Sequence, residues 1–300
     1  MTTNSGLLLL DKPKGLTSHD VVAKVRHIIQ EKRVGHAGTL DPMATGLLVL
    51  AVGPSTRLLR FAQSEVKRYC GAVRLGVATD SLDADGTVIE TRPVPPLSAV
   101  QMSSAALSMV GSQLQIPPMV SAKKVGGRRL HQLARQGVEV EREARAITVH
   151  AFTVTSTDDP TVWNFEVECT VGTYVRVLLS DLAEHVGTVG HLIELRRTAS
   201  GVHHVDDAVT LEEFAQAAQA ADFVLRAPRS FVAHLETVMV SVDEERQMRM
   251  GQQLSLTQLF ESHEIAAVDS TDSLVGILRR RGEKWQPELV LPSSTTTTGE

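Results

Sequence analysis

One carboxylate stands out for its surroundings in the chain. Asp41 lies in a polar, glycine-rich loop over residues 35–46, next to Pro42, and this loop runs into the apolar segment 47–52. Glycine lets the backbone approach a substrate closely, and proline restricts the residue before it to extended conformations, which helps to aim the Asp41 side chain. Asp41 is therefore a candidate for chemistry, although turn-forming and helix-capping roles remain open from spacing alone.

Two basic stretches could hold a polyanion close to this loop. Between Lys12 and Arg33 six basic residues stand against two acidic ones, and between Ser121 and Arg145 seven stand against three, so each stretch has a net charge of +4. The whole chain has a net charge of −5. This asymmetry argues against non-selective coating of nucleic acid and is typical of an enzyme that binds one structured polyanion, although solvated surfaces would give the same pattern.

The elements expected around the loop mix strands with helices. Apolar or alternating segments predict strands at 6–11, 47–52, 67–76, 147–155 and 165–169, and apolar residues at helical spacing predict helices at 18–29, 175–186 and 211–221. Thr17 or Ser18 is the expected cap of the first helix. The predicted fold class is α+β, with a mixed, mostly antiparallel central sheet and flanking helices.

The chain changes character after Pro228. Short strand-like pieces at 238–242, 265–268, 274–278 and 288–291 predict a small β-barrel-like domain. We therefore expect three parts along the chain. These are a large domain over residues 1–230, a small domain over 236–292 and a disordered, Ser/Thr-rich tail over 293–300.

Other motifs and segments exclude several function classes. Residues 81–86 are similar to a calcium loop, but Arg92 stands where the loop requires glutamate. Segments 64–67 and 121–124 both read S-x-x-K without the companion signatures of an acyl-serine enzyme, so a serine hydrolase is a poor second hypothesis. We predict no metal and no cofactor. The early apolar run 7–10 is too short for a membrane span or signal peptide, which predicts a cytoplasmic protein without membrane contact.

Beyond these patterns, seven blocks of sequence resemble one family. The blocks are DKPKG at 11–15, GHAGTLDPMATG at 35–46, KRY at 67–69, PPMVSAKK at 117–124, ARQG at 134–137, GTYVR at 172–176 and LRR at 195–197. In this order they resemble the TruB-type tRNA pseudouridine synthases, which isomerise the uridine numbered 55 in the tRNA T loop. The resemblance spans residues 6–200, and the C-terminal segment is similar, by position and length, to a PUA-like RNA-binding module.

The resemblance implies roles for five residues of one pocket. Asp41 corresponds to the essential aspartate, which attacks the flipped uridine or extracts a proton from its ribose. Arg176 corresponds to the basic partner that would keep this carboxylate charged. Tyr69 matches the aromatic residue that stacks on the target base, and Tyr174 and Leu195 match residues that line the same pocket.

The resemblance also implies contacts around this pocket. His36 corresponds to a histidine that is inserted where the flipped nucleotide left the stack. Lys12 fits a buried lysine that braces the loop, with a phosphate contact as the alternative. The residues expected to face the RNA backbone are Lys123, Lys124, Arg128 and Arg129.

Together these matches imply an isomerase that flips one tRNA uridine and converts it to pseudouridine. The implied partner is the T arm of tRNA, with no obligate protein partner and a monomeric chain. The alternative is a non-catalytic tRNA-binding or tRNA-folding protein on the same platform. Asp41 separates the two, because a binding-only protein has no use for a buried anion that faces a polyanion.

Overall fold

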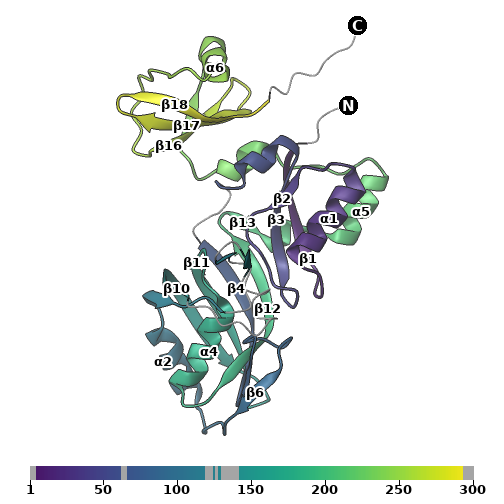
Figure 1. Cartoon of the computed structure of the whole chain (residues 1–300), viewed down its shortest axis with the longest axis vertical. Coiled ribbons are helices and arrows are strands. Elements are labelled where there is room, and N and C mark those ends of the chain that lie inside the picture. The colour runs from purple at the N-terminus through teal and green to yellow at the C-terminus, as the bar shows by residue number, and fades with distance from the viewer. Residues whose placement is uncertain (1–4, 62–65, 119–123, 126–127, 130–141, 293–300) are drawn as a thin grey trace.

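A computed structural model describes residues 5–61, 66–118, 124–125, 128–129 and 142–292, with the backbone alone at 124–125 and 128–129. Its main feature is a ten-stranded mixed sheet with the order β14-β1-β3-β12-β4-β11-β10-β7, in which β2 also pairs with β3 and β13 with β12 (Figure 1). The strands are β1 (Gly6–Lys12), β2 (Val34–His36), β3 (Thr45–Val52), β4 (Val66–Leu75), β7 (Gly111–Gln115), β10 (Arg145–Ser156), β11 (Val162–Thr170), β12 (Gly190–Ser200), β13 (His203–His204) and β14 (Val209–Thr210). The α+β prediction with a mostly antiparallel sheet is confirmed.

The apolar strands β1 and β3 form the buried part of the sheet on which the site is built. They pair antiparallel from Gly6–Val52 to Lys12–Gly46, and β3 then pairs in parallel with β12 at Arg196–Thr45. Because side chains alternate along a strand, β1 sends Leu8 and Leu10 into one core and Leu7 and Leu9 into another. Both faces of this part of the sheet are therefore covered.

Helices cover the sheet in two groups (Figure 1). Helices α1 (Ser18–Ile29) and α5 (Leu211–Gln219) supply Val21, Val22, Val25 and Phe214 to the core beneath them. Helices α2 (Ala99–Ser108) and α4 (Val175–His185) share a second core with β4, β10, β11 and β12. Thr17 caps α1 in a capping box with Asp20, as one of the two predicted caps.

Two hairpins and two turns of 3-10 helix complete the larger part. Strands β5 (Val77–Thr79) and β6 (Val88–Thr91) pair antiparallel, as do β8 (Lys124–Val125) and β9 (Arg128–Arg129). The 3-10 helices η1 (Gly53–Leu58) and η2 (Val205–Asp207) follow β3 and precede β14. The loop between β5 and β6 contributes to the site described below.

The C-terminal residues form a separate four-stranded sheet, ordered β15-β16-β17-β18 (Figure 1). The strands are β15 (Thr237–Met239), β16 (Glu264–Val268), β17 (Leu274–Arg281) and β18 (Lys284–Val290), preceded by η3 (Pro228–Val232). The strand predicted at 238–242 is wrong at its end, because Ser241 caps helix α6 (Val242–Arg249) through a capping box with Glu244. The tail predicted at 293–300 lies outside the described residues.

The C-terminal sheet shares a hydrophobic core with the large one. Leu9, Leu47 and Val49 of β1 and β3 belong to the same buried cluster as Ile277 and Leu289 of β17 and β18. Two arginines connect the larger part to β18: Arg57 Nη1 of η1 donates to the Val290 carbonyl at 2.7 Å, and Arg60 Nη2, just after η1, pairs with Glu288 Oε1 at 2.8 Å. The two sheets therefore pack together and are not merely joined by a linker.

Candidate active site

The loop that contains Asp41 is fixed by hydrogen bonds from three elements. Ser18 at the start of α1 accepts from the Leu40 amide at 2.8 Å and donates to the Leu40 carbonyl at 3.1 Å. Lys12 Nζ donates to the Leu16 carbonyl at 2.7 Å and reaches the Pro42 carbonyl at 3.4 Å. Arg197 Nη2 donates to the Gly38 carbonyl at 3.2 Å. The loop is thus held rigidly on either side of Asp41.

The Asp41 carboxylate forms an ion pair with the start of α4. Arg176 Nε lies 3.0 Å from Asp41 Oδ2, and its Nη1 lies 3.1 Å from Asp83 Oδ2 and donates to the Ser81 carbonyl at 2.8 Å. The side chains of Arg176 and Asp83 are 4% and 7% exposed, whereas that of Asp41 is 36% exposed. A buried guanidinium therefore holds two carboxylates, of which only Asp41 opens to the outside.

Opposing effects set the charge on Asp41. Burial raises its pKa, and the nearby Asp83 carboxylate raises it further, whereas Arg176 and Lys12 act in the opposite direction. The net direction is upward. A carboxylate whose pKa is raised is a stronger base once it is ionised.

Asp41 and Arg176 lie at a cavity of about 260 Å³. The predicted residues Tyr69, Tyr174 and Leu195 line the same cavity. Tyr69 and Leu195 are buried on the adjacent strands β4 and β12. Burial raises the pKa of Tyr69, and the Arg197 guanidinium partly offsets this, so the phenol stays neutral. The structure thus brings five of the predicted residues together around a space that suits a flat base.

Gln115 positions Tyr174, a contact that the sequence did not reveal. Its side chain, buried at the end of β7, accepts from the Tyr174 amide at 2.7 Å and donates to the Tyr174 carbonyl at 3.1 Å. Tyr174 is the N-cap residue of α4 and has no side-chain cap bond. Gln115 therefore fixes the residue that lies two positions before Arg176.

Two predicted residues lie near this cavity without lining it. His36 ends β2, with its ring centroid 5.4 Å from that of His19 in an edge-to-face contact. Burial and the charges of His19 and Arg197 lower the pKa of His36 to about 4, so the ring is neutral. Lys12 is fully buried and its Nζ contacts backbone carbonyls, which fits bracing of the loop and not a phosphate contact.

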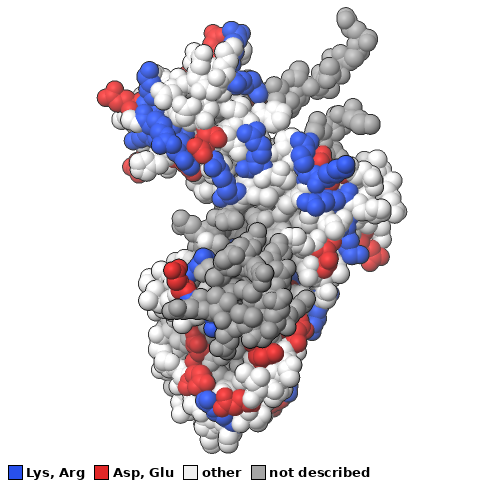
Figure 2. All heavy atoms as spheres, in the orientation of Figure 1, with Lys and Arg blue, Asp and Glu red and all other residues white. Residues whose placement is uncertain are grey.

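The predicted contacts to RNA backbone are placed only in part. Lys123 lies outside the described residues, and for Lys124, Arg128 and Arg129 the backbone of the β8–β9 hairpin is described without side chains. A further basic group, missed from sequence, lies on β17 and β18. Lys and Arg side chains gather over this part of the molecule in Figure 2. The sequence feature that could have revealed this group is the basic run Arg279–Arg281 followed by Lys284. Lys284 pairs with Arg281 across the hairpin.

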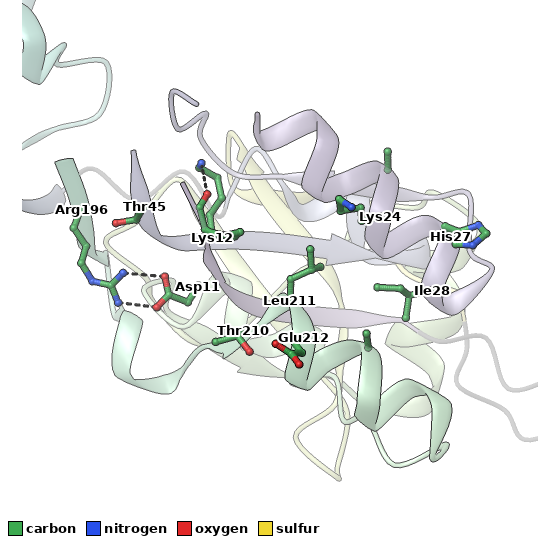
Figure 3. A pocket seen from close by; sticks show the side chains of 13 residues that line it. Asp11, Lys12, Lys24, His27, Ile28, Thr45, Arg196, Thr210, Leu211 and Glu212 are labelled. Carbon is green, nitrogen blue, oxygen red and sulfur yellow. Dashed lines mark hydrogen bonds and ion pairs between the residues drawn. The ribbon is translucent and has the colours of Figure 1, made fainter. Parts of the chain in front are cut away.

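Figure 3 shows a second, larger cavity of about 990 Å³ between α1 and α5. At one end Arg196 forms a bidentate pair with Asp11, at 2.7 Å and 3.0 Å, while Lys24 and His27 lie along α1. The two oppositely charged groups satisfy each other. The smaller cavity is therefore the candidate active site, since it is lined by the Asp41 carboxylate together with two tyrosines, Tyr69 and Tyr174.

The calcium-like segment has another use in this fold. Asp83 accepts a hydrogen bond from the Ser81 hydroxyl at 2.5 Å and forms an ion pair with Arg176. Its negative charge is therefore compensated by another residue of the protein. Within the described part of the chain, no three His, Cys, Asp or Glu side chains are grouped to hold a metal ion. Among the described helices, none has the length and apolar character needed to cross a membrane.

Comparison with known proteins gives the family to which the chain belongs. The family model "TruB family pseudouridylate synthase (N terminal domain)" matches residues 26–175, and "tRNA pseudouridylate synthase B C-terminal domain" matches residues 176–244. The tRNA pseudouridine synthase B of Streptococcus sanguinis is 40% identical over 95% of this chain and 99% of its own. That of Opitutus terrae is 48% identical over 69% of this chain and 86% of its own. The chain belongs to the TruB family of pseudouridylate synthases.

Two solved structures share the fold at lower identity. The chain matched in the crystal structure of a Cbf5-Nop10-Gar1 complex has a TM-score of 0.75 and 21% identity, covering 98% of this chain and 85% of that one. A chain of an H/ACA RNP bound to a substrate RNA containing 2′-deoxyuridine gives a TM-score of 0.74 and 20% identity, covering 96% and 86%. The architecture is therefore one that experimental structures also adopt.

Proposed function

We propose that this protein converts the uridine at position 55 in the T loop of tRNA to pseudouridine, with Asp41 as the reacting carboxylate. Family membership and the names of the relatives support the reaction and the tRNA substrate. Tyr69 stacks on the flipped base, Tyr174 and Leu195 enclose it, and His36 fills the space that it leaves in the RNA. Lys12 braces the loop, and Arg176 holds Asp41 in its reactive position.

The observation that carries this proposal is the Asp41–Arg176 pair at the aromatic cavity. An Arg176 side chain that is 4% exposed orients a carboxylate that is 36% exposed, at a distance of 3.0 Å. A protein that only bound tRNA would gain nothing from this arrangement, since an anion at the cavity repels phosphate. A reactive carboxylate beside a base-sized space fits chemistry at C6 of the base or at the ribose.

The same proposal extends to binding and organisation. A monomer in the cytoplasm binds the T arm, with Lys123, Lys124, Arg128 and Arg129 on the RNA backbone. Residues 1–230 form the catalytic part, and residues 236–292, which contain the sheet β15–β18, form a PUA-like RNA-binding part. The shared core between the two sheets supports a fixed relation between catalysis and tRNA binding.

The test is a comparison of the natural chain with Asp41→Asn on unmodified tRNA transcript. Pseudouridine has the same mass as uridine and is therefore detected by chemical labelling. tRNA binding is measured in parallel. We expect complete conversion of one T-loop uridine by the natural chain, no turnover by the variant, and tRNA affinity within about tenfold, because the amide keeps the shape but not the charge. A transcript with cytidine at position 55 is the matched substrate control. Turnover by Asp41→Asn would contradict the assignment.

A further inference from the structure

A second cation lines the candidate active site, away from the Asp41–Arg176 pair. Lys67, on β4, is 5% exposed and lines the same cavity as Tyr69. The Lys67 ammonium group lies next to Gly38 of the loop. A Cβ atom added to Gly38 would collide with Lys67 Nζ and would lie 3.5 Å from Arg197 Nη1. The glycine at this position therefore makes room for two neighbouring cations under the catalytic loop.

Both cations keep donors that the described part of the protein does not use. Arg197 is fully buried and donates through Nε to the Leu47 carbonyl at 2.7 Å, yet its buried Nη1 has no acceptor among the described residues. Within the same residues, neither a carboxylate nor a hydrogen bond acts on the Lys67 ammonium group. Buried donors normally find partners, and buried charges normally find counter-ions.

The groups around Lys67 that the structure describes do not neutralise it. Arg197 faces it from β12, Cys169 from the opposite position on β11, Tyr69 from its own strand and His36 from β2. Burial and Arg197 lower the pKa of Lys67 to about 8, and Cys169 opposes this. None of these neighbours is a carboxylate, so the pair costs folding free energy unless a ligand compensates it.

The position of Lys67 indicates which part of the RNA meets it. A flipped nucleotide inserts its base into the pocket, while its phosphates remain in the strand outside. The cavity is about 260 Å³ and has Tyr69 and Leu195 in its walls, which suits the base. A donor buried among these walls therefore meets a carbonyl oxygen of uracil and not a phosphate.

We propose that Lys67, with Arg197 behind it, stabilises the negative charge that develops on uracil during the isomerisation; this rests on the proposed function. The bond between ribose C1′ and uracil N1 breaks, and its electron pair stays on the base, shared with the carbonyl oxygens. C5 then bonds to C1′, the proton on C5 is lost and N1 gains one, so the composition is unchanged. Lys67 is a catalytic residue here, and Arg197 is a positioning residue.

The experiment compares Lys67→Met, Lys67→Arg and Arg68→Met with the natural chain. Single-turnover rates at saturating tRNA separate chemistry from binding. We expect Lys67→Met to lose about 100-fold in rate with affinity within about threefold, and Lys67→Arg to recover to within about tenfold. Arg68 is 55% exposed, pairs with Glu168 and points to the other side of β4, so Arg68→Met is the matched control and keeps the natural rate.

The pH profile gives a second readout that a structural role would not move. We expect the natural rate to fall above about pH 8 as Lys67 loses its proton, and we expect this fall to move beyond about pH 10 in Lys67→Arg. A natural rate in Lys67→Met, or a loss confined to affinity, overturns the inference; the latter would indicate a phosphate contact. If Lys67→Met fails to fold, an unchanged alkaline limb in Lys67→Arg overturns it. Absence of pseudouridine with the natural chain would instead overturn the proposed function.

Discussion

At the scale of single residues, Arg176 divides its charge between Asp41 and Asp83. Asp41 reacts only when ionised, so the rate falls as the pH drops through its pKa, which burial and Asp83 raise. Asp83→Asn removes the like charge, and Arg176 then pairs with Asp41 alone. We therefore expect the acid limb, which is the fall in rate at low pH, to move to lower pH. Arg176→Met removes the opposing charge, so the limb moves to higher pH. Single-turnover rates measured from about pH 4 to about pH 8, above the ordinary aspartate pKa, show both shifts.

The two variants should also differ at the pH optimum. Asp83→Asn keeps the guanidinium and should lose roughly tenfold or less in rate, whereas Arg176→Met should lose roughly 100-fold or more. Limbs that move in the same direction in both variants would show that another group governs the acid side.

Tyr69 offers a test of stacking that does not involve charge. Tyr69→Leu removes the aromatic face and should lower the single-turnover rate roughly 100-fold while tRNA still binds, because the base is no longer aligned with Asp41. Tyr69→Phe keeps the face and is the matched control, with a loss of roughly tenfold or less. If both variants lose equally, the phenol and not the ring is what the reaction uses.

At the scale of elements, Gly46 joins the loop to the sheet. It has φ +97°, and an added Cβ would collide with the Arg197 backbone of β12. We expect Gly46→Ala to lower the free energy of unfolding by about 3 kcal/mol or more, because the strained backbone and the collision add. Gly15 has φ +88° with nothing within 4 Å, so Gly15→Ala is the control and should cost about 1–2 kcal/mol. Equal losses in chemical denaturation would show that the collision is relieved by a small shift.

The elements around the loop could be predicted from sequence because their patterns are local. The apolar run 47–52 and the alternation at 67–76 correspond to β3 and β4, and Thr17 marks the start of α1. Helix α2 was not predicted, and α6 was mistaken for the end of a strand although Ser241 and Glu244 have capping-box spacing. Local signals thus locate elements well and their ends less well.

The contacts between distant segments could not be predicted in this way. In the sequence, Asp83 belongs to a segment that is similar to a calcium loop but lacks its glutamate. Its ion pair with Arg176 depends on how the β5–β6 loop packs against α4. Gln115 and Lys67 likewise gain their roles only when their strands are placed beside the cavity. A single sequence carries no signal for these pairings, because each is a product of tertiary packing.

At the scale of the whole molecule, the shared core changes how the C-terminal part must be tested. Deletion of the residues after 236 would remove Ile277 and Leu289 from the buried cluster that also contains Leu9 and Leu47. The loss of apolar burial would destabilise the catalytic part as well. Surface charges are therefore the informative substitutions, since they leave the core intact.

Arg281 and Lys284 are exposed and pair across the tip of the β17–β18 hairpin. If this tip contacts RNA backbone outside the T arm, replacing both by alanine should weaken binding of whole tRNA more than that of an isolated T-arm hairpin. It should also flatten the dependence of log affinity on log salt by about one unit for each lost phosphate contact, because fewer counterions are released.

The matched control is Arg92→Ala, at a half-buried arginine that follows β6, distant from the C-terminal sheet, and that pairs with Glu90 and Glu184. It should leave both the affinity and the salt slope unchanged. Affinity is measured for whole tRNA and for the hairpin across a salt series. Equal loss on both RNAs would place the hairpin tip over the T arm itself, and an unchanged slope in the double variant would mean that β17 and β18 face away from the bound tRNA. Because neither residue is buried, a change in slope cannot be ascribed to unfolding.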